Sequence, residues 1–137
     1  MTNIETNIET TRILASSTLA NLYTGVPLMR GSLVASVDGR VLAADFEESR
    51  QDSAAAVVAS SFALATKLAE VIGTSDVDEM TVHTPNGFIS LFSVGKLAVL
   101  ATMTMPDSNL GLLTIRARQT ATTLEPLIGT LLTGVSK

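Results

Sequence analysis

The sequence predicts an α/β fold, in which a five-stranded, mostly antiparallel sheet is flanked by helices on both faces. The first observation is the order of the expected elements, which is helix, two strands, helix, three strands, helix. The second is a pair of hairpin signals, Asp38-Gly39 and Asn86-Gly87, in which both turn positions are expected to have positive φ. The third is the length of 137 residues, which suits a single domain over 1–137.

Apolar spacing, together with glycine and proline, sets the expected limits of each element. Apolar residues three or four positions apart indicate helices, whereas alternating or continuous apolar runs indicate strands. The helices are expected at about 7–24, at 50–72 and from 108 onward. The strands are expected at 28–37, 41–46, 80–84, 88–94 and 97–105. Because Pro126 must end or kink the last helix, we expect a core over about 7–124 and an apolar tail over 126–137.

The expected helix at 50–72 has three distinct sides. A first apolar face, interpreted as the one that packs on the sheet, carries Val57, Ser61, Leu64, Leu68 and Val71. A second apolar face, interpreted as a dimer interface, carries Ala55, Val58, Phe62, Ala65 and Ala69. The third side is mildly polar and carries Asp52, Ala56, Ser60, Ala63, Lys67 and Glu70. Two apolar faces predict two packing partners, and alanine lets another helix approach closely.

The composition favours a cytoplasmic oligomer. Only 16% of the residues are charged while 46% are hydrophobic, so a domain of this size is expected to cover surface against another chain. The net charge of -4 and the lack of a basic run argue against a nucleic-acid partner. The longest apolar stretch, 54–65, is shorter than the roughly 20 residues of a spanning helix, so no direct membrane insertion is expected. The first residues also lack the features of a signal peptide.

The sequence offers little catalytic or metal-binding equipment, and we expect no catalytic residue, no cofactor and no metal. There is no cysteine, and the single histidine, His83, has no second histidine or carboxylate at ligand spacing. Gly95-Lys96 lacks the remainder of a phosphate-binding loop and is interpreted as a hairpin turn. The acidic run of Asp76, Asp78 and Glu79 is too short for a calcium loop and is interpreted as a solvated connection.

Four segments, in this order and spacing, resemble the roadblock/dynein light-chain family over about residues 7–124. Two lie in the first half of the chain: Val26-Pro-Leu-Met-Arg-Gly31 with the following Ser32-Leu-Val-Ala-Ser-Val-Asp-Gly39, and the alanine-rich helix ending in Leu68-Ala-Glu-Val-Ile-Gly73. Two lie in the second half: the stretch from Asn86-Gly87-Phe88 to Val94, and Pro106-Asp-Ser-Asn-Leu-Gly111. The duplicated Asn-Ile-Glu-Thr at 3–10 and the position of Pro126 depart from the family pattern.

The resemblance implies a non-enzymatic regulator or scaffold that works as a homodimer or a heterodimer with a paralogue. The dimer would have a continuous sheet and paired central helices, so the expected interface also takes in Met80 and Val82. The resemblance further implies a small Ras-like GTPase as partner. The candidate contacts for this GTPase lie on the polar side of the long helix: Ala56, Ser60, Ala63 and Lys67.

The alternative hypothesis is a small-molecule-sensing or scaffold domain within a larger signalling or motility complex. Such a domain needs polar groups that converge inside an apolar pocket. The sequence offers few candidates, all on the middle strands: Ser90, Ser93, Thr102 and Thr104.

Overall fold

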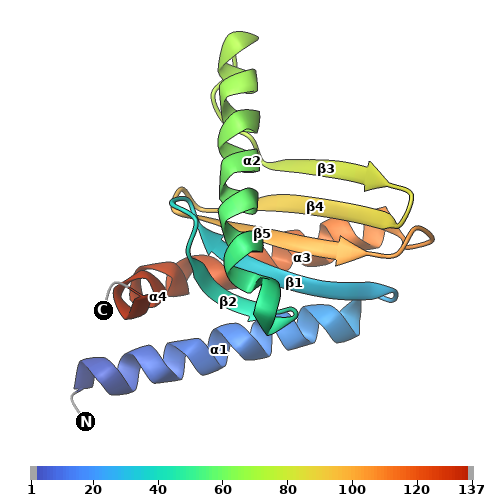
Figure 1. The fold of residues 1–137 in the computed structure, drawn as a ribbon. Helices are drawn as coiled ribbons and strands as arrows, with labels where there is room; N and C mark the ends of the chain where they lie inside the picture. Colours follow the sequence, from blue (N-terminus) through green and yellow to red (C-terminus); the bar gives the residue numbers. More distant parts are fainter. Residues whose placement is uncertain (1–2, 136–137) are drawn as a thin grey trace.

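The computed structural model describes residues 3–135 and has the predicted order of elements (Figure 1). The helices are α1 (Asn3–Gly25), α2 (Gln51–Val71), α3 (Leu110–Leu124) and α4 (Ile128–Val135). The strands are β1 (Met29–Ser36), β2 (Val41–Asp45), β3 (Glu79–Thr84), β4 (Gly87–Val94) and β5 (Ala98–Thr104). Short 3-10 turns precede α2 and α4, at Glu48–Arg50 and Glu125–Leu127.

The five strands form one sheet in the order β2-β1-β5-β4-β3, and every neighbouring pair is antiparallel. This confirms the predicted fold class. The two outer strands differ in their surroundings, because α1 and α4 lie beside β2. Strand β3 pairs only with β4 within the described residues, so its outer edge is free.

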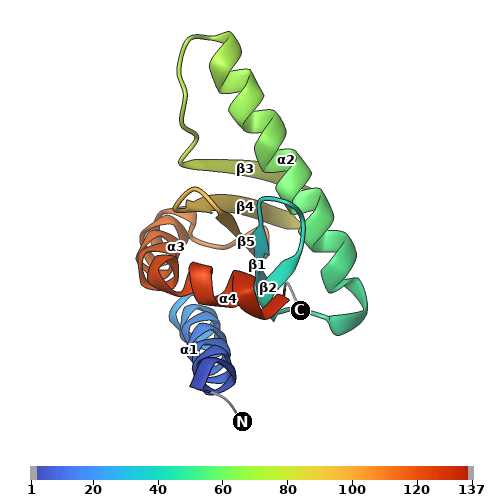
Figure 2. The same cartoon turned by 90° about the vertical axis from the view of Figure 1, so that its left-hand side faces the viewer.

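Helices cover both faces of the sheet, as predicted. Helix α2 crosses one face, while α1, α3 and α4 lie on the other (Figure 2). Alternate strand residues supply the two cores: Leu33, Leu91 and Ala101 face α2. Val34 and Phe92 belong to the larger core beneath α1 and α3. Because side chains alternate along a strand, both faces of the sheet are apolar, and the central strands β1, β5 and β4 are mostly buried on both sides.

The two predicted hairpins are present, but only the glycine of each signal adopts the left-handed conformation. Gly39 has φ +92° and Gly87 has φ +140°, whereas neither Asp38 nor Asn86 has positive φ. A Cβ at Gly87 would lie 2.0 Å from the carbonyl oxygen of Thr104, so glycine is required where β4 starts.

The β1–β2 hairpin is also held by side chains. The Ser36 hydroxyl donates to the Asp38 carboxylate, and Arg40 Nη2 lies 3.2 Å from Asp38 Oδ2. The Ser36 hydrogen bond, with a smaller contribution from Arg40, holds the pKa of Asp38 below its ordinary value.

Both ends of the described range 3–135 are more helical than the sequence indicated. Helix α1 begins at Asn3 rather than near residue 7. Pro126 does end α3, but it lies in the 3-10 turn that leads into α4. The expected tail is therefore a helix, and its side chains Ile128 and Leu131 are buried in the core at 4% and 2% exposure. The core thus extends past residue 124, because α4 packs against α1 and β2.

Replacement of Leu131 tests whether α4 is part of the core. Leu131→Ala removes a fully buried side chain, and we expect it to lower the free energy of unfolding by about 2–5 kcal/mol. Thr133→Ala on the exposed side of α4 is the control and should change stability little. Chemical denaturation followed by circular dichroism measures both, and equal midpoints for the two variants would contradict this role of α4.

Candidate functional site

The side of α2 that packs on the sheet is the one predicted to be a dimer interface. Ala55, Val58 and Ala69 are at most 9% exposed, and Phe62 and Ala65 are half-buried. Ala55, Val58 and Phe62 belong to the core that also contains sheet residues such as Leu33 and Val99. Their assignment to a dimer contact was therefore wrong, since these side chains are engaged within the chain itself.

The neighbouring apolar side of α2 was predicted to pack on the sheet but is exposed. Val57, Leu64, Leu68 and Val71, here called the outer stripe, are 64%, 68%, 66% and 82% exposed. Ser61, assigned to the same face, is half-buried. The two apolar faces are exchanged because small alanine side chains let the helix lie close to the sheet, which leaves the larger side chains outside. Contiguous exposed apolar surface of this kind marks an interaction site.

The outer stripe lies on a helix that reaches past the edge of the sheet. In Figures 1 and 2, the C-terminal half of α2 extends beyond β3, whose outer edge is free. Val82 on β3 is 43% exposed. Met80 was also predicted at the interface, but it is half-buried and packs against the core beneath α2. An unpaired strand edge is a template for pairing with another strand.

The polar side of α2, with the predicted partner contacts Ala56, Ser60, Ala63 and Lys67, is exposed along its whole length. Ser60 donates its hydroxyl to the Ala56 carbonyl oxygen at 2.9 Å. Lys67 forms no ion pair with any residue of the described range 3–135. These four residues form a continuous, weakly charged surface beside the outer stripe.

The polar groups considered for a pocket do not converge. Ser90 and Thr102 are buried side by side in β4 and β5, where the Thr102 hydroxyl donates to the Ser90 carbonyl oxygen at 3.2 Å. Thr104 is 1% exposed, and its hydroxyl has no hydrogen-bond partner in the described part of the chain. Ser93 instead lines a cavity beside α2.

The remaining titratable candidates are dispersed over the surface. His83 is exposed and stacks on Phe88, with a distance of 4.4 Å between the ring centroids. Glu79 begins β3 and pairs with Arg118 of α3. Gly95-Lys96 forms the turn between β4 and β5, as predicted. Within residues 3–135, no three His, Cys, Asp or Glu side chains are grouped so as to hold a metal ion.

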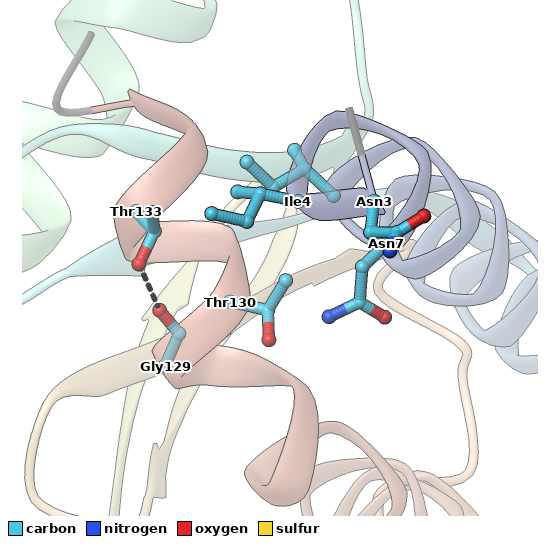
Figure 3. A pocket seen from close by; sticks show the side chains of 7 residues that line it. Asn3, Ile4, Asn7, Gly129, Thr130 and Thr133 are labelled. Atoms are coloured by element: carbon cyan, nitrogen blue, oxygen red, sulfur yellow. Dashed lines mark hydrogen bonds between the residues drawn. The ribbon is translucent and has the colours of Figure 1, made fainter. Parts of the chain in front are cut away.

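A neutral cavity of about 570 Å³ lies between the N-terminal end of α1 and α4 (Figure 3). The duplicated Asn-Ile pairs place Asn3 and Asn7 one turn apart on its wall, opposite Thr130 and Thr133. The Thr133 hydroxyl is bonded to the Gly129 carbonyl oxygen at 3.1 Å. Among residues 3–135, its lining consists of asparagine, isoleucine, glycine and threonine residues.

By length and composition alone, the helical stretch Glu48–Val71 would be able to cross a membrane. The helical stretch is longer than the apolar run 54–65 indicated. A helix that covers the core of a water-soluble domain can have the same length and composition, and α2 packs one of its sides on the sheet. The feature is therefore weak evidence of a membrane span.

The comparisons with known proteins agree with this architecture. The family model for the Roadblock/LC7 domain matches residues 16–104. The chain belongs to the Roadblock/LC7 family. A search of curated proteins found no match.

Solved structures share the fold at low sequence identity. A Roadblock/LC7 domain from Streptomyces avermitilis is 17% identical, with a TM-score of 0.79 and coverage of 82% of this chain and 96% of that one. The gliding protein MglB from Thermus thermophilus is 19% identical, with a TM-score of 0.76 and coverage of 85% and 90%. MglB from Myxococcus xanthus is 15% identical, with a TM-score of 0.74 and coverage of 90% and 91%.

Two neighbouring valines on α2 test which side of the helix packs on the sheet. Val58→Asp places a carboxylate against the sheet, and we expect it to cost several kcal/mol of the free energy of unfolding. Val57→Asp places the same group in solvent and should keep the fold of the single chain. The unfolding temperatures of the two variants are compared by thermal unfolding at a concentration too low for self-association. If the Val57→Asp protein were unfolded while the Val58→Asp protein stayed folded, this orientation of α2 would be contradicted.

Proposed function

We propose that this Roadblock/LC7 protein is a dimeric, non-enzymatic regulator or scaffold that binds a small Ras-like GTPase in the cytoplasm. Family membership supports the regulatory or scaffold role. The main support for a dimer is the outer stripe. Its four large apolar side chains are exposed to solvent on a helix that extends beyond the free edge of β3.

A two-fold arrangement satisfies both exposed features at once. Two copies of β3 that pair edge to edge would extend the sheet across the interface and supply the missing hydrogen bonds. The projecting half of each α2 would then lie over the sheet of the other copy. There the outer stripes of the two α2 helices would pack against each other, beside apolar sheet surface that α2 leaves uncovered, such as Ile89. Burial of the large apolar side chains would supply most of the association energy.

The proposal of a GTPase partner has a different basis. It comes from the family resemblance and from the position of Ala56, Ser60, Ala63 and Lys67, which would stay exposed beside the paired helices. Lys67 would supply a positive charge for steering toward an acidic partner surface. One solved MglB structure, 20% identical to this chain, is described as tetrameric, so self-association occurs among proteins of this fold.

The dimer is tested by its mass in solution. We expect twice the mass of one chain by multi-angle light scattering, and the mass of one chain for the double variant Leu64→Asp/Leu68→Asp, because two like charges would face the partner. Ile13→Asp on α1, where the original side chain is 58% exposed, is the matched control and should remain dimeric. A monomeric wild-type protein at micromolar concentration would remove the dimer from the proposal.

The GTPase partnership is tested by titration against the organism's small Ras-like GTPases in their GDP and GTP-analogue states. We expect binding that Lys67→Glu weakens about tenfold, because the variant reverses a charge on the proposed contact surface. Arg116→Glu, an exposed charge reversal on α3, should bind as the wild type does. If neither nucleotide state binds to the wild-type dimer, the GTPase partnership is wrong even though the dimer stands.

A further inference from the structure

A second cavity, of about 530 Å³, lies between the C-terminal half of α2 and one end of the sheet. Its inner wall is apolar and consists of Ala59 and Phe62 of α2 and Val99 of β5. Its rim is polar: the loop after α2 contributes Asp76 and Asp78. The β4–β5 turn contributes Lys96.

The walls of this cavity are fixed by backbone hydrogen bonds. The amide of Ser93 donates to the carbonyl oxygen of Asp78 at 3.0 Å, which ties the acidic loop to β4. The amide of Val37 donates to the carbonyl oxygen of Leu97 at 3.0 Å, which ties the β1–β2 turn to the β4–β5 turn. The amide of Thr74 donates to the Ala69 carbonyl oxygen at 2.9 Å, which fixes the start of the loop. The cavity is therefore formed before any ligand arrives, as small-molecule sites usually are.

The charged groups on the rim do not neutralise one another. Asp76, Asp78 and Lys96 take part in no ion pair with any residue between 3 and 135. The carboxylates come from the loop after α2, whereas the ammonium group comes from the β4–β5 turn, and all three residues are exposed. The cavity thus offers two anionic groups, a separate cationic group and an apolar wall.

We propose that this cavity binds a small zwitterion with an apolar body, of the class of free amino acids and short peptides. Asp76 and Asp78 would hold the ligand's ammonium group, and Lys96 would hold its carboxylate, by charge-assisted hydrogen bonds. The apolar body would lie on Phe62 and Val99. The volume suits a dipeptide or a large amino acid.

The site is independent of the proposed dimer. The β1–β2 and β4–β5 turns that frame the cavity lie on one side of α2, and the uncovered part of the sheet lies on the other (Figure 1). A partner copy joined at β3 would sit over the uncovered part. Binding of the zwitterion can therefore be measured on the dimer, and its mass can be followed in the same sample.

Isothermal titration calorimetry with L-leucine and the dipeptide Leu-Leu tests the proposal. We expect at least one of the two to bind at millimolar concentration or below. Three analogues provide the chemical controls: 4-methylpentanoate lacks the ammonium group, 3-methylbutylamine lacks the carboxylate, and glycine lacks the apolar body. Each analogue should bind about tenfold more weakly or not at all, since each loses one charged or apolar contact.

Variants of the rim identify the cavity as the site. Lys96→Gln and the double variant Asp76→Asn/Asp78→Asn should each weaken binding about tenfold while keeping the wild-type circular dichroism spectrum, because these side chains are exposed. Arg116→Gln on α3 should bind as the wild type does. The proposal is overturned if neither zwitterion binds, if the amine alone binds as tightly as leucine, or if the rim variants bind normally. None of these outcomes bears on the mass of the dimer.

Discussion

The close packing of α2 on the sheet is the interaction on which the other surface features depend. Ala55 and Ala59 are buried, and their single methyl groups let the helix backbone lie near β1 and β5. A helix held this way turns its larger apolar residues, such as Leu64 and Leu68, away from the core. One packing choice therefore creates both a buried layer and an exposed apolar stripe.

The same packing places the proposed association surface and the proposed ligand cavity on different sides of α2. The sheet face beneath α2 is filled where the helix crosses it and open beyond it, and the helix continues past β3. The surfaces proposed for association thus lie at the β3 edge, while the turns at the other side of α2 frame a cavity whose rim charges form no ion pair within residues 3–135. The opposite face of the sheet, under α1 and α3, has a larger core that includes Phe92 and Leu100.

Local chemistry explains which features were predictable from the sequence. The order of elements and both hairpins follow from short signals such as Asn86-Gly87, because a glycine at a turn acts through its own backbone. The orientation of α2 could not be predicted, since two sides of the helix are apolar and the choice depends on the helix-to-sheet distance. Pro126 was misleading for a related reason. Proline stops one helix but is tolerated at the start of the next turn, and only the tertiary contacts of Leu131 with the core show that the chain continues as a helix.

The contact between α1 and α4 offers a place to attach a label or tether to the molecule. A Cβ on Gly134 would lie 2.9 Å from both Ile8 and Arg12, so the first and last helices are in close contact. Both described ends of the chain lie near this contact, well away from the projecting tip of α2 (Figures 1 and 2). A fluorophore, an affinity tag or a surface tether attached near residue 3 or residue 135 would accordingly leave the β3 edge and the outer stripe accessible. The protein can be immobilised or labelled in one defined orientation without obstructing the surfaces by which it is expected to associate.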